Sequence, residues 1–154
     1  MAFFYIRNKK KPNTLFSTWG GSLPAALYMY DVLNNVSNLH THAEGLVASA
    51  ATLFTVCGHH RTMTKHSTLL IHQPSIYMAG DLKFSDLRDE YSNMQWYTKI
   101  LLDIYKETTT MSYTELVNLI QNEKYLSAEE FLCNRLFLPQ CFQCGLLIFG
   151  HLVQ

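Results

Sequence analysis

The sequence carries no net charge, because 12 lysine and arginine residues offset 12 aspartate and glutamate residues. A protein whose main partner is nucleic acid or an anionic membrane usually has a basic surplus. The balance therefore argues against both partners, and we interpret the basic run at residues 7–11 as a solvated turn or arm. Apolar residues make up 48% of the chain and charged residues 16%, which excludes intrinsic disorder.

Long apolar runs are also missing. No segment reaches the roughly 18–20 apolar residues that cross a bilayer. The start, MAFFYIRNKKK, is unlike a secretion signal, because its positive charge follows the apolar stretch. We expect no membrane partner, and a location in the cytoplasm or inside an organelle. The length favours a single domain over residues 1–154.

Groupings of metal ligands are scarce. Cys141 and Cys144 form one C-x-x-C pair with no second pair at ligand spacing. In a reducing compartment all four cysteines are expected to be free thiols. His40 and His42 would share one face of a strand, where they could contact a metal, although two histidines so placed are more often structural. His72 has no partner at ligand spacing. We therefore predict neither a bound metal nor another cofactor.

Apolar periodicity and turn residues predict alternating strands and helices. The expected elements are a strand at 13–18, a helix at 22–35 that Ser22 can cap, a strand at 37–44 ended by Gly45, a helix at 48–57 closed by Gly58, a short strand near 61–64, a strand at 67–72 and a helix at 81–108. This alternation favours an α/β fold with a parallel sheet and right-handed crossovers.

The helix at 81–108 is the longest expected element. At about 1.5 Å per residue it would extend about 40 Å, so it must project beyond the core or pack on another subunit. Met94, Trp96 and Tyr97 along it are interpreted as helix-packing residues. Two later helices are predicted from capping boxes, namely Ser112 with Glu115 before residues 113–121, and Ser127 with Glu130.

One serine stands at a strand-to-helix junction among small residues, in GLVASAA at 45–51. Small neighbours let a substrate backbone approach Ser49, and the free N–H groups of a helix start suit an oxyanion. The G-x-S-x-G elbow of α/β-hydrolases is absent. Taken alone, this segment is more simply a serine packed at the start of a helix.

Two other features stand beside strand ends. His72, in IHQP at 71–74, follows an apolar strand, where an imidazole can act as general base toward a serine hydroxyl. The glycine pair of WGGS at 19–22 lies between a strand and a helix, and such a corner can offer N–H groups to an anion. Each feature alone also fits a structural histidine and an ordinary turn.

Taken together and in this order, WGGS at 19–22, GLVASAA at 45–51 and IHQP at 71–74 resemble the Clp protease proteolytic subunit family. The stretch YLSAEE at 125–130 resembles the segment that follows that family's third catalytic residue. The helix at 81–108 resembles the handle helix through which two rings meet. The resemblance covers residues 13–131 and implies a Clp protease/crotonase-like fold of repeated βαβ units with a long projecting helix.

The resemblance also implies a function. It indicates a serine endopeptidase subunit of an ATP-dependent ring complex for protein quality control, which cleaves unfolded polypeptides while a partner AAA+ ATPase uses the ATP. Ser49 would be the nucleophile, His72 the general base, and the backbone N–H groups of Gly21 and Ala50 the oxyanion hole. Glu123 stands where the family has aspartate, and Asn122 beside it can hydrogen-bond but carries no charge.

The two ends of the chain depart from the family pattern. Only about twelve residues precede the first expected strand, so the sheet is expected to be incomplete or covered at its edge by another chain. Residues 132–154 are apolar and almost uncharged, which suits a replacement strand, an interface segment or an altered sequence equally well.

Three alternatives stay open. The first is a catalytically weak or inactive structural subunit of a mixed ring, which the glutamate at position 123 and the altered ends favour. The second is an acyl-CoA enzyme of the related crotonase fold, which would need neither Ser49 nor His72 in these places. The third is a protein whose role is oligomer contact through the long helix.

Overall fold

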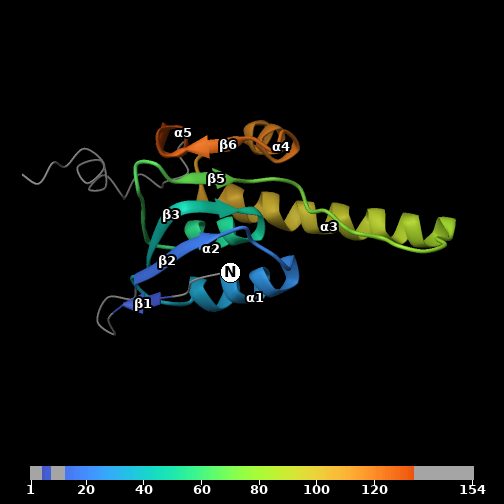
Figure 1. Cartoon of the computed structure of the whole chain (residues 1–154), viewed down its shortest axis with the longest axis horizontal. Helices are drawn as coiled ribbons and strands as arrows, with labels where there is room; N and C mark the ends of the chain where they lie inside the picture. Colours follow the sequence, from blue (N-terminus) through green and yellow to red (C-terminus); the bar gives the residue numbers. More distant parts are fainter. Residues whose placement is uncertain (1–4, 8–12, 134–154) are drawn as a thin grey trace, which may run out of the picture.

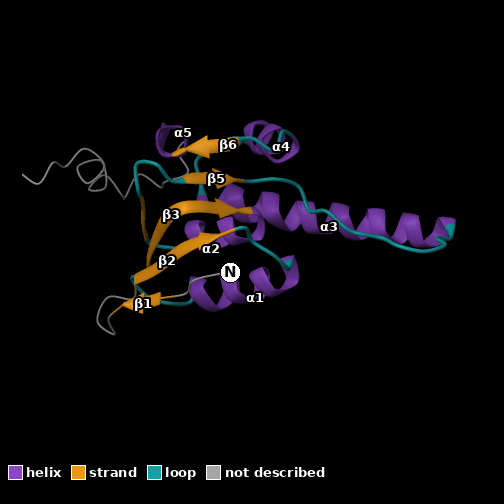
Figure 2. Ribbon diagram, viewed as in Figure 1, coloured by secondary structure: helices purple, strands orange, loops and turns teal. Residues whose placement is uncertain are grey.

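The computed structural model describes residues 5–7 and 13–133, which form one sheet with helices packed around it (Figures 1 and 2). The strands are β1 (Tyr5–Arg7), β2 (Asn13–Thr18), β3 (His40–Ala48), β4 (His60–Met63), β5 (Thr68–Leu70) and β6 (Tyr125–Ser127). The helices are α1 (Leu23–Asn34), the 3₁₀ turn η1 (Ser49–Ala51), α2 (Thr52–Val56), α3 (Phe84–Thr108), α4 (Tyr113–Gln121) and α5 (Ala128–Cys133). The predicted α/β fold with a long projecting helix is confirmed.

The sheet is mixed, with the order β1-β2-β3-β5-β6, and β4 pairs with the first half of β3. Strands β2, β4 and β5 run parallel to β3, as the alternation of strands and helices predicted. The sheet is not parallel throughout, because β1 and β6 pair antiparallel at its two edges. Neither of these two short edge strands was predicted from the sequence.

Strand β3 does not end at Gly45, contrary to the prediction. Gly45 has a φ of +62°, and the register between β3 and β2 shifts at this point. Residues 40–43 of β3 pair with β4, whereas residues 46–48 pair with β5. The glycine therefore bends the strand and moves its pairing from one neighbour to the next, which brings the end of β3 beside β5.

Three other boundaries differ from the expected ones. The helix predicted from residue 48 begins only at Thr52, because η1 comes first. Strand β5 ends at Leu70, two residues before its predicted end. Gly58 follows α2, as predicted, but its φ is not positive. Glycine is required there for a steric reason, because a Cβ would overlap the Thr41 side chain. Ser22 takes the N-cap position of α1, but its side chain makes no capping hydrogen bond.

The core lies where α2 packs between β3 and the other helices. Helix α2 contacts β3, α1 and α3, and α3 in turn contacts α4. The apolar side chains that are fully buried here come from β3, α2, β5 and α4, and they are Val47, Leu53, Val56, Leu69 and Leu116. Burying a side chain of this kind contributes about 1.5–3 kcal/mol, so these elements hold the strand ends that carry the site.

Helix α3 projects out of the domain (Figure 1). Its C-terminal part is buried through Leu101, Leu102 and Tyr105, whereas Phe84 and Tyr91 in its first half are 80% and 65% exposed. No helix within the described ranges is both long enough and apolar enough to cross a membrane. The prediction that this helix must extend beyond the core is confirmed.

Both predicted capping boxes are present. The Ser112 hydroxyl accepts a hydrogen bond from the N–H of Glu115, whose carboxylate accepts from the N–H of Ser112. Ser127 and Glu130 make the same exchange at the start of α5. Lys124 also donates to the Glu130 carboxylate, and it is chiefly this bond, followed by those from Ser127, that lowers the pKa of Glu130 from 4.5 to about 2.

We predict that Glu130 makes stability depend on acidity. Because its pKa is lower in the folded than in the unfolded state, its contribution is complete above about pH 4.5 and disappears as the pH falls toward about 2. The free energy of unfolding of the wild type should exceed that of Glu130→Gln at neutral pH, and this difference should shrink over that range.

Urea unfolding of both proteins from pH 7 to pH 2.5 measures the effect. Glu129→Gln is the matched control, since it removes a neighbouring carboxylate outside this set of hydrogen bonds. A difference between wild type and Glu130→Gln that stays constant with pH would contradict the prediction.

Candidate active site

Ser49 follows the last residue of β3 and has a φ of +58°. A residue other than glycine in this left-handed region costs about 1–3 kcal/mol, and such conformations persist only where the surroundings enforce them. Here Ser49 is the first residue of η1 and directly follows β3, so both elements restrain it. The sharp turn separates this side chain from the alternation of the strand and directs it into a cavity that it lines.

The glycine corner packs directly on this turn. Gly20 has a φ of +90°, and a Cβ at this residue would lie 2.6 Å from the carbonyl oxygen of Ala48 and 2.8 Å from Cβ of Ser49. Only glycine fits at such a distance without displacing the turn. The sequence marked the glycine pair as an anion corner, but the steric role of Gly20 toward Ser49 emerges only from the structure.

His72 lies just beyond β5 and lines the same cavity as Ser49. Its segment is anchored on both sides, because Ile71 is buried in the core and the N–H of Gln73 donates to the carbonyl of Ile120 in α4. The His72 side chain is 19% exposed. No hydrogen bond found among the described residues joins the His72 ring to the Ser49 hydroxyl.

Glu123 is the charged neighbour of His72. Its carboxylate Oε1 lies 3.8 Å from Nδ1 of the ring, which is an ion-pair distance and longer than a hydrogen bond. The Glu123 side chain is 64% exposed, so solvent weakens the attraction. Glu123 has a φ of +46°, and the adjacent Asn122 donates its amide N–H back to Asn118 within α4. Glu123 is therefore the acidic group that the fold places beside this imidazole.

The cavity has a volume of about 220 Å³ and receives residues from four parts of the chain. Gly21, Ser22, Leu23 and Pro24 come from the start of α1, Ser49 and Ala50 from η1, His72, Gln73, Pro74 and Ser75 from the segment after β5, and Met94, Tyr97, Leu101 and Tyr105 from α3. The fold thus joins a polar edge with a serine and a histidine to a largely apolar wall.

Four of the five predicted site residues line this cavity: Gly21, Ser49, Ala50 and His72. Glu123 does not line it and contacts it only through His72. Met94 and Tyr97, interpreted from the sequence as packing residues, belong to the cavity wall, whereas Trp96 is 59% exposed. A helical stripe cannot tell these roles apart, because the same spacing serves a core and a pocket.

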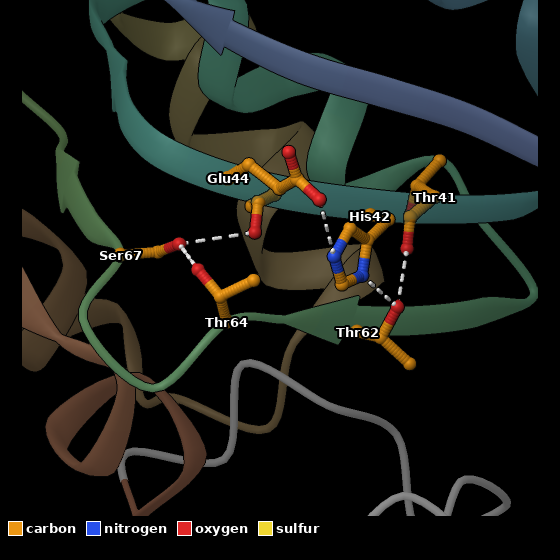
Figure 3. A network of polar contacts seen from close by, with 7 residues as sticks. Thr41, His42, Glu44, Thr62, Thr64 and Ser67 are labelled. Atoms are coloured by element: carbon orange, nitrogen blue, oxygen red, sulfur yellow. Dashed lines mark hydrogen bonds and ion pairs between the residues drawn. The ribbon is translucent and has the colours of Figure 1, made fainter. Parts of the chain in front are cut away.

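The two histidines of β3 lie apart from this cavity. The His42 ring lies between the Thr62 hydroxyl, 2.6 Å from Nδ1, and the Glu44 carboxylate, 3.4 Å from Nε2 (Figure 3). The His40 ring stacks on His60. Among the residues that the structure describes, no group of three histidine, cysteine or acidic side chains is arranged to hold a metal ion. Cys57 is a buried free thiol, and Cys141 and Cys144 lie outside the described part of the chain.

Comparison with known proteins gives an independent result. The family model described as Clp protease matches residues 3–133. An ATP-dependent Clp protease proteolytic subunit 1 from Cutibacterium acnes is 30% identical over 71% of this chain and 52% of its own length. A subunit of the same name from Chlamydia trachomatis is 31% identical over 72% of this chain and 59% of its own length.

A chain from Bigelowiella natans named ATP-dependent Clp protease proteolytic subunit is 28% identical over 72% of this chain and 57% of its own length. The present chain thus spans somewhat more than half the length of these curated relatives. The matched region contains the glycine corner, the Ser49 turn, His72 and α3. On this match, and with the fold described above, the chain belongs to the Clp protease family.

Proposed function

We propose that this chain is a serine endopeptidase subunit that hydrolyses peptide bonds of unfolded polypeptides through Ser49 and His72. The observation that carries the proposal is the meeting of a serine in a strained, left-handed turn with a histidine at the edge of one cavity. Strained backbone of this kind concentrates at functional sites. Membership of the Clp protease family supports the same reaction.

The proposed reaction uses the two side chains in sequence. The Ser49 hydroxyl adds to the carbonyl carbon of the scissile peptide while its proton passes to Nε2 of His72. His72 gives this proton to the leaving amine as the C–N bond breaks, which leaves an ester on Ser49. Water then adds to the ester carbonyl, its proton returns through His72 to the serine oxygen, and the acid product departs.

The negative oxygen formed in each addition needs donors that are already in place. The backbone N–H groups of Gly21 and Ala50 are proposed for this role, since both residues line the cavity beside Ser49. Ala50 lies in the first turn of η1, where N–H groups have no acceptor within the helix. Chemistry of this kind needs no cofactor in the chain itself.

Glu123 is proposed as the third member of the triad, which holds the His72 ring through Nδ1. At 3.8 Å, and with its side chain 64% exposed, it holds the ring less firmly than a buried, hydrogen-bonded carboxylate would. This same observation favours a second candidate, a catalytically weak or inactive subunit that serves the structure of a mixed ring.

The assembly is also a proposal. The exposed aromatic side chains in the first half of α3 suit contact with another subunit, and the relatives are named ATP-dependent proteolytic subunits. We propose a homo- or hetero-oligomeric ring that receives substrate from an AAA+ ATPase partner, in the cytoplasm or inside an organelle. In this arrangement the partner, not this chain, uses the ATP.

We predict that Ser49→Ala lowers peptidase activity by at least about 10⁴-fold, because loss of the nucleophile removes the ester pathway. Hydrolysis of an unfolded protein measures this, and sedimentation shows whether the subunit still assembles like the wild type. Equal hydrolysis by the wild type and Ser49→Ala would remove the proposal. A folded wild type with no activity at all would favour the inactive subunit.

For the proposed triad carboxylate, we predict that Glu123→Ala and Glu123→Gln lower kcat about 10- to 100-fold. This is less than the roughly 10⁴-fold effect of a buried triad carboxylate, because Glu123 is exposed. Glu123→Asp should keep or raise the rate, since a shorter side chain loses less rotamer freedom when it holds the ring. Equal rates in all four proteins would show that Glu123 is not part of the triad.

The glycine corner yields a third prediction for this site. Gly20→Ala should abolish turnover, because the added Cβ would displace the carbonyl of Ala48 and the side chain of Ser49. Gly80→Ala is the control, since Gly80 also has a positive φ but a Cβ there meets nothing within 4 Å. Turnover by Gly20→Ala equal to that of Gly80→Ala would contradict the packing argument.

A further inference from the structure

Two buried hydroxyl groups behind Ser49 have no part in the reaction proposed above. Thr52, the first residue of α2, is completely buried, and Tyr105 near the end of α3 is 2% exposed. Their oxygens lie 2.6 Å apart, so the two side chains join α2 to α3 inside the core. A buried polar pair between two helices contributes little net stability, although it is costly to break on one side only.

The direction of these hydrogen bonds follows from the number of protons. The Thr52 hydroxyl also lies 2.6 Å from the carbonyl oxygen of Ser49, which can only accept. Thr52 has a single hydroxyl proton and donates it there, so its oxygen accepts from the phenol of Tyr105. Burial raises the pKa of Tyr105 to about 12, so the phenol keeps its proton at neutral pH.

The acceptor is one end of a catalytically important peptide. The carbonyl of Ser49 and the N–H of Ala50 belong to the same peptide unit, which is planar and trans, so they point in opposite directions. A hydrogen bond that fixes the carbonyl therefore also fixes the direction of the N–H. The backbone N–H of Thr52 bonds to the same carbonyl, and the hydroxyl adds a second restraint.

We propose that Thr52 and Tyr105 are positioning residues, which aim the N–H of Ala50 at the oxyanion by holding the Ser49 carbonyl through the series Tyr105–Thr52–Ser49. The inference rests on the proposed roles of Ser49 and Ala50. Because Tyr105 lies at the buried base of α3, the series connects this projecting helix to the turn of the nucleophile. Donation by the phenol also polarises the threonine hydroxyl and strengthens its bond to the carbonyl.

A fluorophosphonate probe measures this effect directly, because its phosphoryl oxygen occupies the place of the oxyanion while the serine oxygen displaces fluoride. The maximal labelling rate of Ser49 should fall about 10-fold in Tyr105→Phe and about 10- to 100-fold in Thr52→Val. These losses are smaller than the roughly 10²–10³-fold effect of removing an oxyanion donor, because the N–H of Ala50 is misdirected but still present. Binding of the probe before reaction should change little. Thr52→Ser keeps the hydroxyl and should keep the rate within about threefold.

The double variant Thr52→Val/Tyr105→Phe separates positioning from stability. Removing both polar groups leaves no unsatisfied partner, so its thermal stability should return toward that of the wild type. Its labelling rate should stay as low as that of Thr52→Val, because Tyr105 acts only through Thr52. Thr55→Val is the matched control, because Thr55 is buried in the same helix and its hydroxyl donates to the carbonyl of Thr52 but makes no hydrogen bond to Ser49.

Recovery of both stability and labelling in the double variant would overturn the inference and leave a merely structural pair. A rate loss in Thr55→Val equal to that in Thr52→Val would overturn it as well. If the folded wild type is not labelled at Ser49 at all, the proposed function itself fails and the inference fails with it. If the wild type is labelled at Ser49 and both Tyr105→Phe and Thr52→Val are labelled at the same rate, the inference fails while the proposed function stands.

Discussion

The left-handed backbone of Ser49 is the constraint on which the rest of the site depends. A serine in this conformation must be held by contacts from several sides, and three parts of the fold provide such contacts. Gly45 bends β3 so that its last residues lie beside β5, and Gly20 has no Cβ that would overlap the turn at Ala48 and Ser49. The Thr52 hydroxyl holds the Ser49 carbonyl from within α2. These contacts act on the same short turn and together keep Ser49 in the conformation in which it lines the cavity.

The same arrangement explains why the cavity has two unlike sides. Strand ends and the turns after them provide the polar edge, because there the backbone leaves the sheet and its polar groups can bind a ligand. The buried base of α3 provides Leu101 and Tyr105 for the apolar wall. Helix α3 thus combines a role in the core, a role at the site and an outer half that is available for contact with another subunit.

The sequence predicted the α/β fold, the long helix and both capping boxes, since these depend on local patterns of apolar residues and caps. It also singled out Ser49 and His72, although each motif alone fitted a structural role and only their order pointed to a peptidase. It could not reveal that β1 and β6 pair antiparallel at the sheet edges, because such pairing depends on tertiary contacts. Nor could it show that Gly45 bends a strand, that Met94 lines a cavity, or that Thr52 meets Tyr105, because these depend on contacts between distant segments.

A crystal structure of the chain after reaction with a small fluorophosphonate would show directly whether Ser49 is the nucleophile and where the oxyanion binds. We expect phosphorus bonded to the Ser49 oxygen, the phosphoryl oxygen within hydrogen-bond distance of the N–H groups of Gly21 and Ala50, and Nε2 of His72 facing the serine oxygen. Phosphorus on another residue, or a phosphoryl oxygen that points away from both N–H groups, would contradict this expectation.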